Sequence, residues 1–431
     1  MRFTILKALV LSVLLTHGTV QASAMQTAAN RVVSALAKTN ASLANGAKAV
    51  VFGIVLGATA CGVTGCDTDN MDNTTVLGEA KRDVVMIGFS STLEMFDGSI
   101  QGAELAVQQI NASGGIDGRM VELVVRDVGL TPEQAVAAVN GLIDEGVHVL
   151  VGPEFSTQSV VVSKIAQQAE IPMLTTASTN PAVTDAGDMV SMATFTDDFQ
   201  GLVMAELAAN ELDAWTAAVI TQAADVYSEG LADTFTEHFM ALEGSVVVRD
   251  SFEFGEVDFG PQLERVAAAN PDVLFVPAFQ PESSLLVKQA REMGITAIAL
   301  GADGWATADL LPVGGEALNG SYYSDHFSAD IVQDLSADTI AFISAYSEAY
   351  GVKPDALAAL SYDAIHLMAQ AIDRANSLIG WEVAASLANT QNYSGATFLS
   401  HFDENRHPHK DAVVNSIQDG AIVLHGLVSP Q

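Results

Sequence analysis

The stretch VHVLVGPEFSTQSVVVSKIAQQAEIPMLTTASTNP, residues 147–181, decides the fold class of this chain. It opens with a β-branched apolar run, 147–151, which is typical of a buried parallel strand, and Gly152 and Pro153 end that run. Apolar residues then recur with helical spacing, and 171–175 is a second strand-like run. The order strand, helix, strand predicts a parallel α/β unit.

Both predicted strands end in hydroxyl-rich turns, which form the first candidate site. Ser156 and Thr157 follow the first strand and open the helix, while Ser178 and Thr179 follow the second strand. Ligands of open α/β sheets bind beyond the carboxyl ends of the strands, and a helix N-terminus there favours a carboxylate or phosphate. The same side chains could instead only cap helices and turns. Two such turns on neighbouring strands favour the anion site.

The alternation of strands and helices continues on both sides of this stretch, as in parallel sheets with helices on both faces. Its strands are too many for one comfortable sheet, so two similar α/β lobes are expected. The predicted strands are 83–89, 120–126, 147–151, 171–175, 216–220, 245–252, 273–276 and 296–300, with a closing pair at 412–417 and 421–424. Three helices are predicted after the eighth strand, at 337–350, 355–374 and 381–388.

The composition indicates an acidic globular protein. The 431 residues are 49% hydrophobic, enough for two or more domains with their own cores. The net charge is −34, and all 52 acidic residues lie after Cys66. Such a surface repels nucleic acid and anionic lipid headgroups, so neither is expected as a partner.

Residues 1–66 are predicted to be an export and lipoprotein leader. Basic residues precede an apolar run and an A-x-A cleavage pattern at its start, as in a signal peptide. A second leader-like run ends in VTGC at Cys66, which resembles a bacterial lipobox and predicts lipidation there; Cys61 is the weaker candidate. Translation from Met25 would explain the presence of two leaders. The second run is too short to span a bilayer, and residues 67–82 read as a flexible tether.

Several stretches match one family in order from about residue 83 to the C-terminus. Together they resemble the type I periplasmic binding proteins of the leucine/isoleucine/valine-binding kind, the receptors of branched-chain amino-acid ABC importers. The stretches are QGAELAVQQINASGGIDGRMVELVVRD (101–127), TPEQAVAAVNGLIDEGVHVLVGP (131–153), IPMLTTASTNPAVTD (171–185), VYSEGLADTF (226–235), PDVLFVPAFQPESSLLVKQAREMGITAIALGADGW (271–305) and SYDAIHLMAQAI (361–372).

The resemblance implies two Rossmann-like lobes that close on a ligand and are joined by three crossovers. The implied crossovers lie near 194–197, 322–326 and 409–412. The implied lobes are 83–195 plus 324–410 for lobe one, and 196–323 plus 411–431 for lobe two.

The resemblance also implies how an amino acid is held. An acid of lobe two, Asp303, would bind the ammonium group with help from Tyr227, because a carboxylate and an ammonium in a dry cleft form a strong charge-assisted hydrogen bond. The ligand carboxylate would be bound by Ser156, Thr157, the backbone of Ala177, Ser178 and Thr179.

Preference for the ligand side chain is expected to come from apolar and aromatic residues in the surrounding loops, although each of them could equally be a packing residue. The loop SSTLEMFDG (90–98) lacks the usual Gly-Pro-x-Thr-Gly pattern of the family, which leaves the ligand open. Gln280 stands where an aromatic residue is common and indicates a more polar pocket. The expected side-chain contacts are Met95 or Phe96, Phe155, Phe279 and Trp305.

An enzyme is the first rival class, and it is not favoured. No G-x-G-x-x-G follows a strand, no G-x-S-x-G is present, and no cysteine lies in the predicted fold. We therefore expect no catalytic residue and no cofactor. The cluster HFDENRHPH (401–409) could suggest a metal site, but it aligns with a Phe-Asp-x-x-Gly turn of the family, so no metal is expected.

The predicted function is an extracytoplasmic substrate-binding protein of an ABC importer, which captures a branched-chain or related amino acid and delivers it to a membrane permease. Two alternatives stay open. The chain could be the ligand-binding subunit of a sensor, which would need a membrane partner. It could also be a receptor for another small molecule, such as an amide or a small carboxylate.

Overall fold

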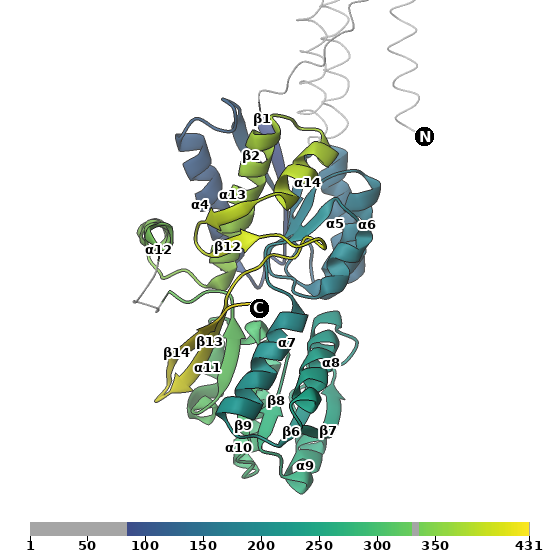
Figure 1. The fold of residues 1–431 in the computed structure, drawn as a ribbon, viewed down its shortest axis with the longest axis vertical. Coiled ribbons are helices and arrows are strands. Elements are labelled where there is room, and N and C mark those ends of the chain that lie inside the picture. Colours follow the sequence, from purple (N-terminus) through teal and green to yellow (C-terminus); the bar gives the residue numbers. More distant parts are fainter. Residues whose placement is uncertain (1–83, 330–335, 431) are drawn as a thin grey trace, which may run out of the picture. The chain divides into compact units, whose positions relative to one another are not determined.

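The computed structural model of the chain describes residues 84–329 and 336–430, which belong to one compact unit (Figure 1). The predicted leader, with Cys61 and Cys66, lies outside the described residues, as do Met25 and the predicted tether 67–82. None of the helices in the described ranges is long and apolar enough to cross a membrane.

The first sheet has five parallel strands in the order β2-β1-β3-β4-β5. Helices α4 and α13 cover one face, where alternate residues of β1 are buried, and helices α5 and α6 cover the other face. The strands are β1 (Val84–Ser91), β2 (Met120–Asp127), β3 (Val149–Val151), β4 (Met173–Thr175) and β5 (Val190–Met192). The helices are α4 (Asp97–Ala112), α5 (Pro132–Glu145), α6 (Ser156–Gln168), α13 (Ala356–Ala375) and α14 (Gly380–Ala388).

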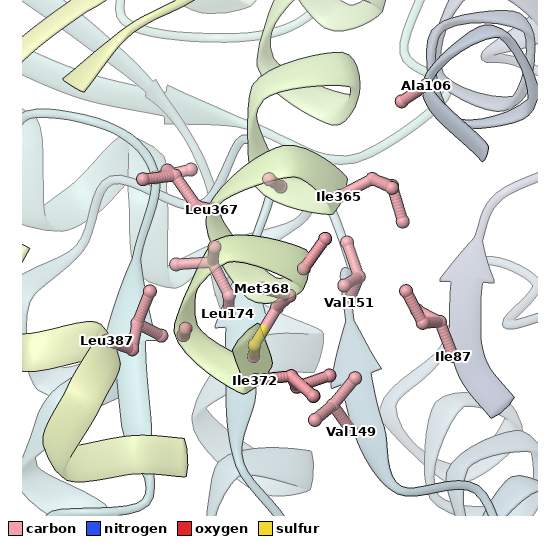
Figure 2. Close-up of a cluster of buried hydrophobic side chains, with 14 of the residues drawn as sticks. Ile87, Ala106, Val149, Val151, Leu174, Ile365, Leu367, Met368, Ile372 and Leu387 are labelled. Carbon is pink, nitrogen blue, oxygen red and sulfur yellow. The ribbon is translucent and has the colours of Figure 1, made fainter. Parts of the chain in front are cut away.

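Helix α13 supplies much of the core of this lobe although it lies far from the sheet in the sequence. Ile365, Met368 and Ile372 recur at helical spacing and are buried against Val149 and Val151 of β3 (Figure 2). These contacts tie the C-terminal half of the chain to the first sheet.

The second sheet has seven strands in the order β14-β13-β10-β9-β8-β6-β7. Its strands β6 to β10 are parallel, and the hairpin β13–β14 is antiparallel, as predicted for the end of the chain. Helices α7 and α8 cover one face, and α9 and α10 the other. The strands are β6 (Thr216–Gln222), β7 (Ser245–Phe252), β8 (Val273–Phe275), β9 (Ile298–Gly301), β10 (Tyr322–Asp325), β13 (Ala412–Gln418) and β14 (Ala421–Val428). The helices are α7 (Asp197–Glu206), α8 (Val226–Ala241), α9 (Gly260–Ala269) and α10 (Glu282–Glu292).

The chain passes between the two sheets three times, after β5, after β10 and before β13. The predicted fold class, two Rossmann-like lobes joined by three crossovers, is therefore confirmed. The remaining elements are α12 (Ala337–Tyr350), the hairpin β11 (Gln391–Ser394) and β12 (Phe398–His401), the short helices η1 (Pro181–Ala186), η3 (Asp303–Trp305), α11 (Leu310–Gly314) and η4 (Gly315–Leu318), and the π-helical turn η2 (Leu207–Glu211).

Four short strands, β5, β10, β11 and β12, were not predicted, because three or four residues carry little periodic pattern. Strand β10 occupies the segment in which the second crossover was predicted. Residues 322–326 were expected to link the lobes, but Tyr322–Asp325 form β10, an interior strand between β9 and β13. The chain leaves the second sheet only after Asp325.

Candidate functional site

The hydroxyl-rich turns lie where the sequence predicts them, at the carboxyl ends of β3 and β4. Ser156 is the first residue of α6, and the N-cap residue Phe155 provides no side-chain cap. The Ser156 Oγ accepts a hydrogen bond from the backbone N–H of Asn180 at 3.3 Å, which joins the two turns. Within the described part of the chain, the first turn of α6 is thus left without the side-chain cap that the alternative explanation requires.

The two hydroxyls of the second turn have different surroundings. Ser178 Oγ lies 2.6 Å from Ser159 Oγ and donates to the Glu154 carbonyl at 2.9 Å, so its side chain is used inside lobe one. Thr179 Oγ1 is buried and makes no hydrogen bond of standard geometry among the described residues, but it lies close enough to the Asp197 carboxylate to lower the pKa of that group. Ala177, between the turn's polar residues, is partly exposed. Among the described residues of this turn, Thr179 and Thr176 both have buried hydroxyls with unused hydrogen-bonding capacity.

Thr157 contacts the other lobe. Its Oγ1 donates to the Asp225 carboxylate at 2.8 Å and accepts from the Val226 N–H at 2.9 Å. Asp225 is the N-cap of α8, and its other carboxylate oxygen accepts from Ser228 N. The hydroxyl of Thr157 is therefore occupied by lobe two.

Asp303 and Tyr227 are brought together as the resemblance implies. The Tyr227 hydroxyl donates to Asp303 Oδ1 at 2.7 Å and accepts from the Gly304 N–H at 3.0 Å. His326 Nε2 lies 3.2 Å from Asp303 Oδ2. The Asp303 N–H donates to Gln200 Oε1 at 3.0 Å, so the backbone of this turn is also held in place.

The carboxylate of Asp197 was not selected from the sequence, because an acidic residue in the first turn of a helix is ordinarily explained by the helix dipole. In the structure Asp197 is fully buried, and neither of its oxygens makes a hydrogen bond of standard geometry within the described ranges, although the nearby Thr179 hydroxyl lowers its pKa. Its backbone N–H donates to the Thr179 carbonyl at 2.8 Å, which places it next to the second turn. No feature of the sequence distinguishes it from its exposed neighbour Asp198.

Burial and like charge dominate the electrostatics of this site. Burial, and then the negative charge of Asp303, raise the pKa of Asp197 well above its ordinary value. Burial also raises the pKa of Tyr227 well above its ordinary value, and the carboxylates of Asp303 and Asp197 raise it further. Burial lowers the pKa of His326, whose Nε2 lies within hydrogen-bond distance of Asp303 Oδ2. The site thus holds negative charge that a cationic group would offset.

We expect Asp197→Asn to stabilise the ligand-free protein at neutral pH. Because the pKa of Asp197 is raised, the folded chain holds more protons than the unfolded chain from about pH 4 upward. The contribution of the Asp197 carboxyl group to the free energy of unfolding is complete below that pH. It is lost as the pH rises through the raised pKa of Asp197. The variant should therefore show a smaller loss of unfolding free energy between pH 4 and pH 8, measured by urea titration. Asp198→Asn, which changes an exposed carboxylate, is the matched control, and equal pH dependence in all three proteins would refute the expectation.

Of the residues expected to contact the ligand side chain, three are phenylalanines that lie next to one another. Phe96, Phe155, Phe279 and Tyr227 form a run of neighbouring rings, with centroids 5.3, 4.8 and 4.9 Å apart in that order. The run joins lobe one to lobe two, because its first two rings belong to the first lobe. Met95 is 41% exposed.

Gln280 and Trp305 are both buried but differ in their polar contacts. The amide of Gln280 has no partner for either of its polar atoms among the described residues. Trp305 is fully buried in the core of the second lobe, where Nε1 donates to the Val276 carbonyl at 2.9 Å. A Cβ added at Gly301 would lie 2.1 Å from the indole ring, so Trp305 fills the space beside a glycine. This is the packing role that its sequence position also allowed.

Another buried acid that the sequence analysis did not select, Glu154, lies at the end of β3. Its carboxylate accepts from Ser91 Oγ at 2.5 Å and from Ser99 Oγ at 2.7 Å, and these bonds join the end of β1 and the start of α4 to the turn after β3. Burial raises its pKa, although the two hydroxyls partly offset that shift. Glu154 therefore supports the turn that carries Ser156.

The histidine-rich segment forms a turn. Asp403 Oδ1 accepts from the backbone N–H groups of Asn405 and His407, each at 2.8 Å. His401 and His409 stack with ring centroids 4.2 Å apart. Within residues 84–329 and 336–430, no three histidine, cysteine, aspartate or glutamate side chains are grouped so that they could hold a metal ion.

Comparisons with known proteins match this chain to one family. A family model described as a periplasmic binding protein matches residues 87–421. The chain is 33% identical over 280 residues to an amino acid binding protein of Pseudomonas aeruginosa, which covers 64% of this chain and 74% of that protein. It is 29% identical over 259 residues to the Leu/Ile/Val-binding protein of Escherichia coli K12, which covers 60% of this chain and 70% of that protein.

Solved structures with the same fold include two that are named as binding proteins for leucine or branched-chain amino acids. The leucine binding protein LivK of Thermotoga maritima has a TM-score of 0.76 at 32% identity and covers 80% of this chain and 99% of its own. The branched-chain amino acid transporter substrate binding protein LivJ of Streptococcus pneumoniae, in complex with isoleucine, has a TM-score of 0.74 at 28% identity, with the same coverage. A solute binding protein of R. palustris in complex with benzoate has a TM-score of 0.72 at 20% identity, which shows the shared fold alone.

Proposed function

This chain belongs to the type I periplasmic binding proteins of the leucine/isoleucine/valine-binding family, and from that premise we propose that it captures an amino acid outside the cytoplasm for an ABC importer. Members of this family are solute-binding proteins of extracytoplasmic compartments and not enzymes. The amino-acid ligand, the membrane permease as partner and the delivery step are our proposal. The lobes proposed to close on the ligand are 83–195 plus 324–410 and 196–323 plus 411–431.

One observation carries the amino-acid ligand: the carboxylate of Asp197 is fully buried and lies near that of Asp303, whose charge raises the Asp197 pKa. An α-ammonium group has three N–H donors and one positive charge. It would satisfy the oxygens of Asp197, add a donor to Asp303 and reduce the repulsion between the two acids. We propose that Asp303, Asp197 and Tyr227 bind the ammonium group.

The ligand carboxylate is assigned to the two turns of lobe one. Thr179 offers a buried hydroxyl that makes no hydrogen bond of standard geometry among the described residues, and Ser156 is the first residue of α6, whose N-cap side chain makes no capping bond. Backbone N–H groups at a helix N-terminus and a hydroxyl donor together suit an anion. We propose that Ser156, Thr179 and the backbone at Ala177 bind the carboxylate, and that the rings of Phe96, Phe155 and Phe279 with Gln280 surround the ligand side chain.

A small carboxylate without an amino group is the second candidate, since a structural neighbour is in complex with benzoate and the amide of Gln280 makes no hydrogen bond within the described ranges. Such a ligand brings negative charge and leaves Asp197 and Asp303 without a cation. The electrostatics of the site therefore favour an amino acid. A sensor role uses the same ligand site and differs only in the membrane partner.

The test compares ligands that differ in one group. The purified protein is titrated with leucine, with its 2-keto analogue, which lacks the ammonium group, and with benzoate, and thermal unfolding is followed. A ligand at a hundred times its dissociation constant adds about 2.7 kcal/mol to the unfolding free energy, which raises the melting temperature measurably. We expect a shift with leucine or another amino acid and none with the keto acid. Equal shifts with the keto acid or with benzoate would overturn the ammonium site and leave the fold assignment intact.

We also propose that residues 1–66 direct export and that Cys66 is lipidated. The support is the sequence pattern at this cysteine together with the extracytoplasmic family. Labelling of cells with a radioactive fatty acid should mark the wild-type protein and not Cys66→Ser. Label retained in that variant but lost in Cys61→Ser would move the anchor to Cys61.

A further inference from the structure

The two residues before Tyr227, Asp225 and Val226, stand at the start of helix α8, and both form hydrogen bonds with lobe one. Asp225 accepts from Thr157 Oγ1 at 2.8 Å, and the Val226 N–H donates to the same hydroxyl at 2.9 Å. The Val226 carbonyl accepts from Asn180 Nδ2 at 3.0 Å. Thr157 and Asn180 come from the turns after β3 and β4, which hold the proposed carboxylate site.

These three hydrogen bonds leave little capacity on the side chains that make them. The hydroxyl proton of Thr157 points to Asp225, and one of its lone pairs accepts from Val226. The amide of Asn180 uses Nδ2 for Val226, while Oδ1 accepts from the Ala182 N–H at 3.1 Å. Both side chains are therefore engaged within the protein and need no ligand to satisfy them.

Helix α8 of lobe two lies so close to Asn180 that there is little space between them. A Cβ added at Gly230, one turn into α8, would lie 2.4 Å from Asn180 Nδ2. The ring of Phe155 packs edge-on against Phe279 at 4.8 Å, which gives the same two lobes a second contact. A close approach of α8 to the turns of lobe one thus depends on a glycine at this position.

We propose that Thr157 and Asn180 are positioning residues that form a clasp between the lobes. They hold the Tyr227 end of α8 against lobe one and raise ligand affinity without touching the ligand. The clasp consists of Thr157, Asn180, Asp225 and the backbone of Val226. This inference rests on the proposed function for its ligand, and it removes Thr157 from the ligand contacts that the family resemblance implies.

The expected effect on affinity follows from linkage between closure and binding. If only the closed arrangement brings Tyr227 and Asp303 to the ligand, the apparent dissociation constant rises in inverse proportion to the closed fraction. The clasp contains one hydrogen bond to a carboxylate and two that involve backbone groups. The free energy that such bonds contribute sets the size of the expected change in affinity. Removing the Thr157 hydroxyl should therefore weaken binding by roughly 10- to 100-fold.

The experiment uses the whole protein and three matched substitutions. Thr157→Val keeps the shape of the side chain and removes the hydroxyl, whereas Thr157→Ser keeps the hydroxyl. Asn180→Asp keeps the Oδ1 acceptor for Ala182 and replaces the donor to Val226 with an acceptor. Thr236→Val removes a hydroxyl that bonds only within α8, to the Ala232 carbonyl, and is the control.

Two quantities are measured for each protein: the dissociation constant for leucine by calorimetry, and the radius of gyration by X-ray scattering, with and without saturating leucine. We expect Thr157→Val and Asn180→Asp to weaken binding and to increase the radius of gyration, while Thr157→Ser and Thr236→Val stay near the wild type. Weaker binding with an unchanged radius in both conditions would make Thr157 a ligand contact and overturn the clasp. Unchanged affinity and radius would also overturn it. If the wild type binds no amino acid, the proposed function fails, and the comparison of radii without ligand still decides the clasp.

Discussion

Asp303→Asn is expected to weaken binding of leucine, or of the amino acid that this protein prefers, by roughly 30- to 4000-fold. Removing one partner of a buried, hydrogen-bonded charge pair costs about 2–5 kcal/mol, and each 1.4 kcal/mol is about tenfold in affinity. The side chain of Asp303 is 11% exposed, and its two oxygens are held by Tyr227 and His326, so the carboxylate is oriented before a ligand arrives. The asparagine keeps the shape and removes the charge that the ammonium group needs.

Calorimetric titration with leucine measures this loss directly. Asp309→Asn changes an exposed acid a few residues further along the same segment and should leave the dissociation constant unchanged. The variant at Asp303 should also lose most of its discrimination between leucine and the 2-keto analogue. Wild-type affinity in Asp303→Asn would exclude this carboxylate from the ammonium site.

Gly102→Ala is expected to cause a large loss of stability in lobe one. Gly102 lies in α4, and a Cβ added there would be 2.1 Å from the carbonyl oxygen of Ala358 in α13. The obstructing atom belongs to the backbone of a buried helix, so two helices must separate to admit one methyl group. Overpacking typically costs about 1–3 kcal/mol, and we expect this variant at or above that upper value.

The free energy of unfolding in urea checks this expectation. Gly141→Ala is a matched control, because Gly141 is also a helical glycine, in α5, and a Cβ added there meets no atom within 4 Å. That change should stabilise the protein by about 0.5–1 kcal/mol, since alanine loses less conformational freedom than glycine in a helix. The same sign for both variants would mean that α4 and α13 are not packed as closely as described.

The contrast between the two glycines shows where sequence reasoning is limited. The periodicity of apolar residues predicted both helices, and the glycine in each would count as a minor local defect. The two glycines differ because the backbone of Ala358, far along the chain, lies against Gly102 and no atom within the described ranges lies against Gly141. A pattern in a window of residues reports which face is buried, but it does not identify the atoms that cover that face.

Some residues of the candidate site were likewise identified from the sequence, and others only from the structure. Asp303 and Tyr227 were reached through resemblance to a family, and Thr179 through its place after a strand. Asp197 was missed, because its local pattern is that of an ordinary helix start, and its significance comes from complete burial beside Asp303. Thr157 and Ser178 belong to the turns that were predicted, yet both hydroxyls are used by the protein itself.

The sequence by itself determined the alternation of strands and helices, the two-lobed fold class, and the turns where a ligand would bind. These features follow from local physics: backbone hydrogen bonding, the spacing of apolar residues and the turn preferences of glycine and proline. Tertiary structure alone decided which polar side chains in those turns remain unsatisfied. Thr157 and Asp225 lie 68 positions apart, and their hydrogen bond exists only because both lobes are folded and in contact. The partners of a buried polar group are set by such distant contacts, and these decide whether the group supports the fold or is left for a ligand.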